Sequence, residues 1–146
     1  MTPQPLAFPG AVNRLVAFVH VANVDTSLEF YALLGFSVRS ALRDGAASFW
    51  AMAQSGGGEI MFARASGPVD ADQQAVLFYM YSERVADLRE RLLRAGLHDG
   101  GAFNGMPGPG GGRRVVFALT HPRHMPAGEL RIADPDGYVI LVGQLS

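Results

Sequence analysis

The alternation of apolar and polar residues near the end of the chain predicts a β-hairpin. Over residues 129–132, glutamate and arginine alternate with leucine and isoleucine, which is the period of a strand with one buried face. Asp134-Pro135-Asp136-Gly137 follows and favours a turn, because Pro fixes φ, Gly accepts positive φ and Asp can bond its own backbone. The apolar stretch Tyr138 to Val142 then predicts the second strand.

The same patterns predict an element order that occurs twice along the chain. Each half reads as strand, helix and three further strands, with a polar linker between the halves. The expected strands before the hairpin cover 14–22, 36–42, 47–53, 59–65, 75–81 and 114–119, and the expected helices cover 27–34 and 85–95. Thr26 and Glu29 have the spacing of a capping box at the first helix. Residues 97–112 are rich in Gly and Pro and predict a long loop.

Neither half is large enough to bury an adequate core alone, so we expect one structural domain. Its predicted parts are an irregular arm over 1–12, a βαβββ module over 13–66, a linker over 67–73 and a second βαβββ module over 74–146. The fold class expected from this order is α+β, with the strands in a curved mixed sheet.

Composition excludes several classes of function. The chain has 146 residues, a formal net charge of −1 and no cysteine, so thiolate chemistry is excluded and nucleic acid is a poor partner. No apolar run is long enough to cross a membrane, and the N-terminal residues lack the pattern of an export signal. All twelve basic residues are arginine, which with the many Ala and Gly indicates a bacterial source. We therefore expect a cytoplasmic protein.

Three segments in order resemble the vicinal oxygen chelate superfamily. They are Asn23-Val-Asp-Thr-Ser-Leu-Glu-Phe-Tyr31 with Leu34-Gly-Phe36, then Val85-Ala-Asp-Leu88 with Leu93-Arg-Ala-Gly96, and Pro126 to Tyr138. This superfamily contains glyoxalase I, extradiol dioxygenases and bleomycin-resistance proteins, and the resemblance covers about Arg14 to Gln144. It implies two βαβββ modules around a concave ligand cleft, and a homodimer.

The resemblance also implies where a catalytic metal would bind in the enzymes of this family. The corresponding positions hold Val16, Leu77 (or Ala75) and Leu141, and only Glu59 on the fourth strand could be a ligand. A catalytic divalent ion needs about three protein ligands. We therefore expect no metal and no other cofactor.

The strand patterns predict a pocket with aromatic walls and a few polar tips. If Val16 marks the concave face, the alternation places other side chains on it. The candidate ligand-binding residues are Phe18, His20, Trp50, Glu59, Tyr79, Tyr81, Glu129 and Leu141, with Phe49 as an alternative to Trp50. Such a pocket suits a planar, partly apolar molecule. Glu129 and Arg131 could hold a ligand, but an ordinary cross-strand charge pair is the simpler interpretation.

Two functional classes remain open at this point. The first is a binding protein of the bleomycin-resistance type that sequesters an antibiotic or another aromatic molecule. The second is a lyase, isomerase or dioxygenase of the glyoxalase type, whose metal would be held by His20, Glu59 and His121 or His124, or a metal-free enzyme that uses Glu59 or His20 as base. Neither a phosphate-binding loop in Gly105 to Gly112 nor a nucleophile elbow is predicted.

Overall fold

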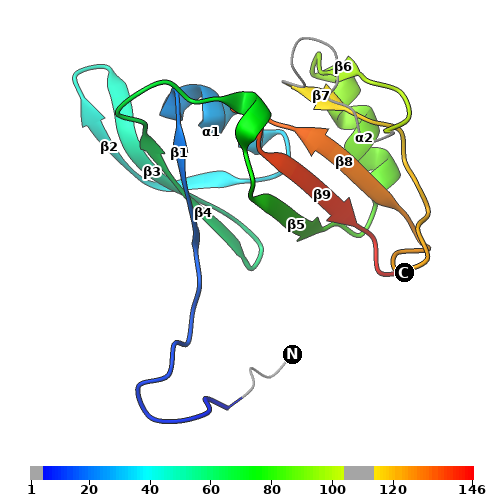
Figure 1. Ribbon diagram of the computed structural model, residues 1–146, viewed down its shortest axis with the longest axis horizontal. Coiled ribbons are helices and arrows are strands. Elements are labelled where there is room, and N and C mark those ends of the chain that lie inside the picture. Colours follow the sequence, from blue (N-terminus) through cyan, green and yellow to red (C-terminus); the bar gives the residue numbers. More distant parts are fainter. Residues whose placement is uncertain (1–4, 104–113) are drawn as a thin grey trace.

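The computed structural model describes residues 5–103 and 114–146, and its elements occur in two similar sets (Figure 1). The first set is β1 (Ala17–Val21), α1 (Val24–Ala32), β2 (Ser37–Asp44), β3 (Ala47–Ser55) and β4 (Gly58–Arg64). A short 3₁₀ helix, η1 (Ala71–Gln73), precedes the second set. This set is β5 (Leu77–Tyr81), α2 (Val85–Arg94), β6 (His98–Asp99), β7 (Val115–Val116), β8 (Glu129–Ala133) and β9 (Val139–Gly143).

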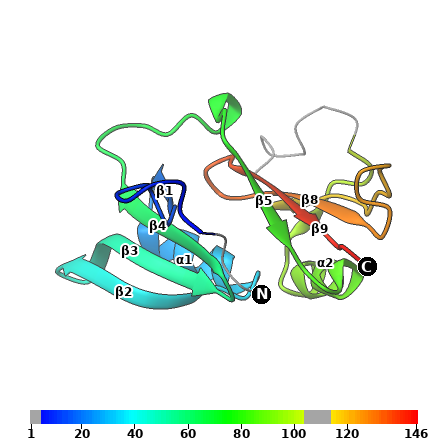
Figure 2. The same ribbon diagram turned by 90° about the horizontal axis from the view of Figure 1, so that it is seen from below.

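The strands form two mixed sheets, one from each half of the chain. The first sheet has the order β1-β4-β3-β2 and the second has the order β5-β9-β8-β7-β6. In each half the first strand pairs in parallel with the last, and the neighbouring hairpins are antiparallel. The two halves lie side by side (Figure 2). The α+β class is therefore confirmed. The first half has the predicted order, whereas the second half has one strand more than predicted, and the strands divide into two sheets.

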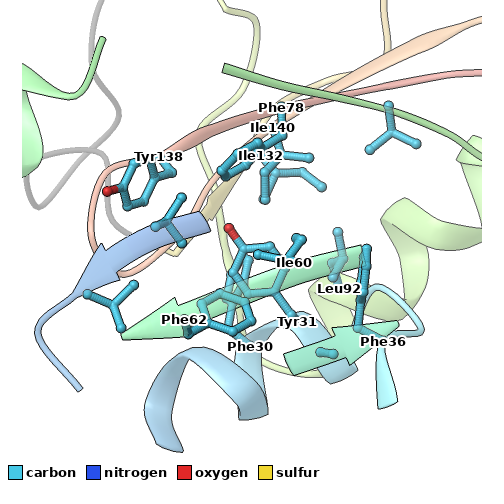
Figure 3. Close-up of a cluster of buried hydrophobic side chains, with 14 of the residues drawn as sticks. Phe30, Tyr31, Phe36, Ile60, Phe62, Phe78, Leu92, Ile132, Tyr138 and Ile140 are labelled. Atoms are coloured by element: carbon cyan, nitrogen blue, oxygen red, sulfur yellow. The ribbon is translucent and has the colours of Figure 1, made fainter. Parts of the chain in front are cut away.

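Both halves contribute to one hydrophobic core (Figure 3). Phe30 and Tyr31 from α1 and Phe62 from β4 are fully buried, as are Leu92 from α2 and Ile140 from β9. The ring of Tyr31 contacts those of Phe30, Phe36 and Phe62, with centroid distances of 5.4, 5.9 and 5.0 Å. No helix in the described part of the chain is long and apolar enough to cross a membrane.

The first helix begins earlier than predicted. Asn23 is its N-cap, because the Asn23 side chain accepts a hydrogen bond of 3.0 Å from the backbone N–H of Thr26. The predicted start at Ser27 and the capping box at Thr26 are therefore wrong. Ser27 lies inside the helix, where it is buried and its hydroxyl donates to Asp136.

The region between α2 and β8 also differs from the prediction. His98–Asp99 forms β6, which pairs in parallel with β7, so the predicted loop contains a short strand. The strand predicted over 114–119 is reduced to Val115–Val116, although the N–H of Phe117 still donates to the Arg131 carbonyl of β8 and Thr120 forms an isolated bridge with Glu129. The segment Gly105 to Gly112 lies outside the described residues.

Two buried carboxylates connect the halves. One oxygen of Asp134 accepts the hydroxyl proton of Tyr31 on α1 at 2.7 Å. Its other oxygen accepts the backbone N–H groups of Asp136 at 2.9 Å and Tyr138 at 2.8 Å. Asp136 in turn accepts the backbone N–H of Ala22, which follows β1, at 2.8 Å. The turn that closes the second sheet is thus bonded directly to the first half.

The titration of Asp134 should make stability depend on pH. Burial raises the pKa of Asp134 from 3.8 to about 6 in the folded protein. The folded state therefore binds more protons than the unfolded state between these values, and its stabilisation is lost as the pH rises through about 6. We expect the free energy of unfolding to fall by about 1 to 3 kcal/mol across this range.

Urea denaturation of the wild type and Asp134→Asn at several pH values checks this expectation. The variant keeps the side-chain shape but cannot ionise, so its stability should change much less over the same range. An unchanged pH slope in Asp134→Asn would show that another group is responsible.

Candidate functional site

One face of the first sheet is open to solvent and carries aromatic side chains. Strand register places His20, Ala63, Trp50 and Leu42 in one row across β1, β4, β3 and β2. Phe18, Met61, Met52 and Ser40 form the next row. The Phe18 side chain is 54% exposed, and its ring stacks with that of His20 at a centroid distance of 5.8 Å. These two rows thus form a largely apolar surface with one imidazole.

A β-bulge decides which aromatic residue of β3 joins this face. Leu42 pairs with Trp50 and Arg43 pairs with Ser48, so Phe49 is the extra residue between them. Trp50 is half-buried in the row of His20, whereas Phe49 is more exposed at the bulge. Both residues line an open hollow of about 470 Å³ at this end of the sheet, together with Leu42, Ala63 and Arg64.

Glu59 lies far from His20 and is already paired. Its carboxylate accepts hydrogen bonds from the Arg14 guanidinium, with a distance of 2.9 Å from Nε to Oε1. His20 pairs with Ala63, four residues along β4 from Glu59. At about 3.3 Å per residue this separation is roughly 13 Å, so His20 and Glu59 cannot bind one metal ion.

The second sheet also has an open face, with the alternation predicted for its first strand. Tyr79, Leu141 and Arg131 form one row across β5, β9 and β8, because both Tyr79 and Arg131 pair with Leu141. Tyr81, Gly143 and Glu129 form the neighbouring row. Phe78 points into the core, whereas Tyr79 is 40% exposed. Val76 precedes the strand and is exposed.

Glu129 is the centre of a polar cluster on this second face. Its Oε2 atom accepts the hydroxyl proton of Tyr79 at 2.6 Å and lies 2.9 Å from Nε2 of His124. The Tyr79 hydroxyl passes over Gly143, where an added Cβ would lie only 2.9 Å from it. Burial and the Glu129 carboxylate raise the pKa of Tyr79 to about 12. The hydroxyl therefore stays protonated and acts as a donor.

Arg131 does not form the expected cross-strand pair with Glu129. Its guanidinium carbon lies 3.3 Å from the centre of the Phe103 ring, which is a cation–π contact. Burial lowers the pKa of Arg131. Among the described residues, no carboxylate forms an ion pair with this guanidinium. The expectation of a simple charge pair was wrong because Tyr79 and His124 bind the Glu129 carboxylate instead.

The remaining histidines do not gather with acidic residues into a metal site. His121 Nδ1 lies 3.0 Å from the carbonyl oxygen of Pro126, and His124 binds Glu129 alone. His98 is exposed on β6. Within residues 5–103 and 114–146, no group of three or more His, Asp or Glu side chains could hold a metal ion. The ligand set of His20, Glu59 and His121 or His124 therefore does not assemble in this chain.

The candidate residues thus divide between two faces. Phe18, His20, Trp50 and Glu59 lie on the first sheet, whereas Tyr79, Tyr81, Glu129 and Leu141 lie on the second. A separate hollow of about 570 Å³ lies between the halves, lined by the β3–β4 turn and by Tyr79 to Ser82. Sequence reasoning did not foresee that His124 binds Glu129 or that Arg131 stacks on Phe103, because both contacts depend on how loops fold onto the sheet.

Comparison with known proteins identifies similar sequences and structures. The model of the family described as glyoxalase/bleomycin resistance protein/dioxygenase superfamily matches residues 12–142. No curated protein matches the sequence. A crystal structure of a bleomycin-binding protein complexed with bleomycin has a TM-score of 0.66 and 18% identity, over 91% of this chain and 98% of that chain.

Two other solved structures are similar over comparable lengths. A bleomycin resistance determinant encoded on the transposon Tn5 has a TM-score of 0.66 and 17% identity, over 91% of this chain and 98% of that one. An antibiotic-binding protein from Streptomyces sp. CB03234 has a TM-score of 0.56 and 18% identity, over 92% of this chain and 98% of that one. At these identities the likeness concerns the fold.

The polar cluster can be tested through the ionisation of Tyr79. Replacing Glu129 with Gln removes the negative charge that opposes formation of the tyrosinate. We expect the pKa of Tyr79 to fall from about 12, while burial keeps it above 10.0. Nuclear magnetic resonance of ¹³Cζ-labelled tyrosine, titrated with base, measures this pKa separately from those of the other tyrosines.

The His124→Gln variant is the matched control. This substitution changes the second hydrogen-bond partner of Glu129 and leaves the Glu129 carboxylate in place beside Tyr79. An unchanged Tyr79 pKa in Glu129→Gln would mean that the hydrogen bond between these two side chains does not form in solution.

Proposed function

This chain belongs to the glyoxalase/bleomycin resistance protein/dioxygenase superfamily, and we propose that it binds a small, partly aromatic molecule without a catalytic metal. The observation that carries this proposal is the exposed aromatic surface of both sheets. Phe18 and Trp50 lie in adjacent rows of the first face, and the rings of Tyr79 and Tyr81 lie 5.4 Å apart on the second. Large apolar side chains on open faces are a cost in water unless something covers them.

The residues at the family's metal positions do not fit a metal. Val16, Leu77 and Leu141 offer no donor atom, and the Glu59 carboxylate is engaged by Arg14. A divalent ion at this place would have one oxygen ligand from a paired side chain, fewer than such sites use. The donor set therefore supports binding of a ligand over metal-assisted chemistry.

The similar structures support an antibiotic or a related planar molecule as the ligand. One of them is complexed with bleomycin, and another is described as an antibiotic-binding protein. Polar groups that could orient such a ligand are present beside the aromatic surfaces. His20 lies on the first face, and Tyr79 and Glu129 lie on the second. Sequestering a toxic aromatic molecule requires affinity alone, and exposed aromatic and apolar side chains are suited to provide it.

We also infer that the protein is a homodimer. The segment before β1 extends away from the body of the molecule (Figure 1) and exposes Leu6, Phe8, Val12 and Leu15, the last by 86%. An ion pair between Arg14 and Glu59 links this segment to β4. An apolar arm together with two open aromatic faces is more apolar surface than a monomer normally leaves in water. A second copy of the chain would cover it.

Ligand binding can be measured through Trp50, the only tryptophan of the chain. We expect saturable changes in its fluorescence with bleomycin or with the neutral aromatic probe 2-naphthamide. Phe18→Ala removes a ring in the neighbouring row and should weaken binding about threefold to tenfold. Val76→Ala, which removes a similar exposed apolar group outside both faces, should leave the affinity unchanged.

The same preparation, purified without chelator, should contain no stoichiometric metal by plasma mass spectrometry. About one transition-metal ion per chain would contradict metal-free binding and favour a glyoxalase-type enzyme. Absence of saturable fluorescence changes or of heat in calorimetry with both probes would contradict the binding function itself.

The dimer can be tested by light scattering after gel filtration. With a chain mass of 15.6 kDa, a dimer has a mass of 2 × 15.6 = 31.2 kDa. A charge in the arm, as in Leu15→Asp, should shift the equilibrium toward monomer because an aspartate would be buried without a partner. Leu145→Asp places the same charge at the exposed C-terminal end and should remain a dimer. A wild type of monomer mass at micromolar concentration would refute the homodimer.

A further inference from the structure

We propose that Arg131 binds the anionic group of the ligand, so that the ligand class is an aromatic acid. This inference rests on the proposed function, because it identifies which aromatic molecule the second face would take. It goes beyond the comparisons, which concern the fold and say nothing of charge. It is supported by the contacts of Arg131 and by the positions of the carboxylates in the chain.

Arg131 is a half-buried cation for which the chain offers no counter-charge. Its guanidinium stacks on Phe103 at 3.3 Å and lies 5.9 Å from the centre of the Phe117 ring. It forms no ion pair with a carboxylate of the described residues. Residues 1–4 and 104–113, which the structure does not describe, contain no Asp or Glu. In the described arrangement, no carboxylate of the chain binds this guanidinium, so its charge is available to a carboxylate of another molecule.

Another half-buried arginine of this chain has both an ion-pair partner and a hydrogen-bond acceptor. Arg89, on α2, lies 2.8 Å from the Asp99 carboxylate and donates from Nε to the Phe117 carbonyl at 2.9 Å. A cation taken partly out of water is costly unless it is paired and hydrogen-bonded. Arg89 meets both conditions within the chain, whereas Arg131 has aromatic contacts alone among the described residues. The unused hydrogen-bond donors of Arg131 are suited to a planar carboxylate.

The row that contains Arg131 also carries an apolar and an aromatic side chain beside the charge. Leu141 lies between Arg131 and Tyr79 in the register of the sheet. Neighbouring strands are about 4.8 Å apart, so the backbones of Arg131 and Tyr79 are separated by roughly 10 Å. A one-ring or two-ring aromatic acid could lie on Leu141 with its carboxylate at Arg131 and its ring beside Tyr79.

The neighbouring charge fixes the orientation of such a ligand. Glu129 lies on the same face, two residues before Arg131, and would repel an anion. Its Oε2 atom is bound by Tyr79 and His124, and it forms no ion pair with the Arg131 guanidinium. An acid that binds with its carboxylate toward Arg131 is attracted by the guanidinium. Because the carboxylate then points away from Glu129, it avoids repulsion by that side chain. A protonated amine would have to displace the Tyr79 and His124 partners and would meet the Arg131 cation.

A matched pair of probes tests the inference on the wild-type protein. The probes are 2-naphthoate and 2-naphthamide, which have the same rings and differ in charge, measured by isothermal titration calorimetry at neutral pH. We expect the acid to bind about tenfold to a hundredfold more tightly than the amide, which is the range of a charge-assisted hydrogen-bonded pair. The Leu141 and Tyr79 resonances should shift on titration, placing the probe on this row.

Variants then assign the preference to Arg131. In Arg131→Gln and Arg131→Met the affinity for the acid should fall to that for the amide, while the amide affinity changes little. Arg131→Lys should keep part of the preference, because it retains charge but loses the planar fork. Arg94→Gln, at the exposed end of α2, should bind both probes as the wild type does. The wild-type comparison does not depend on the folding of any variant.

The outcomes separate this inference from the proposed function. Equal affinity for acid and amide in the wild type would overturn the role of Arg131 but leave aromatic binding in place. An acid preference that persists in Arg131→Gln would also overturn it. If the Arg131 variants dissociate the dimer and the wild type shows no acid preference, the partner copy supplies the counter-charge and the inference fails. Failure of both probes to bind would refute the proposed function and this inference together.

Discussion

The arrangement of the whole molecule depends on the two buried carboxylates of the β8–β9 turn. Asp134 binds the Tyr31 hydroxyl, and Asp136 binds the backbone after β1, so one turn holds the helix and first strand of the other half. Buried carboxylates are tolerated because each of their oxygens accepts at least one hydrogen bond. The helical sides of both halves can then pack into one core, which leaves the opposite side of each sheet uncovered. The open faces are thus a consequence of how the halves are joined.

The register of the strands in each sheet brings alternating residues together into two chemically different surfaces. The first face has rows of apolar and aromatic side chains with a single imidazole at its edge. The second has tyrosines, a hydrogen-bonded carboxylate and a cation on an aromatic ring. Because the two surfaces belong to different sheets, they could contribute different parts of one recognition process. In the proposed function, the first would supply apolar contact area and the second would distinguish the charge of the ligand.

The sequence predicted those parts of the fold that depend on local patterns. Alternation identified which residues of β5 face outward, and Asp134 to Gly137 predicted the turn, because both signals act over a few residues. The predicted start of α1 was wrong because Asn23 and Thr26 are both possible N-cap residues within four positions. The burial of Ser27 decides between them. The bulge at Phe49 depends on a partner strand, and no local pattern reveals it. The role of Asp134 between the halves required Tyr31, about a hundred residues earlier.

Gly143 shows how such a site constrains the evolution of its sequence. An added Cβ there would lie 2.8 Å from the Met125 methyl carbon and 2.9 Å from the Tyr79 hydroxyl, so neither neighbour could stay in place. A larger residue at Gly143 would therefore displace the tips of Met125 and Tyr79, and the Tyr79 hydroxyl cannot move without straining its bond to Glu129. Homologues with another residue at this position should have lost the bond between Tyr79 and Glu129 and with it the chemistry of the second face. Among proteins this divergent, the combination of Tyr79, Glu129 and Gly143 should follow ligand preference more closely than overall identity does.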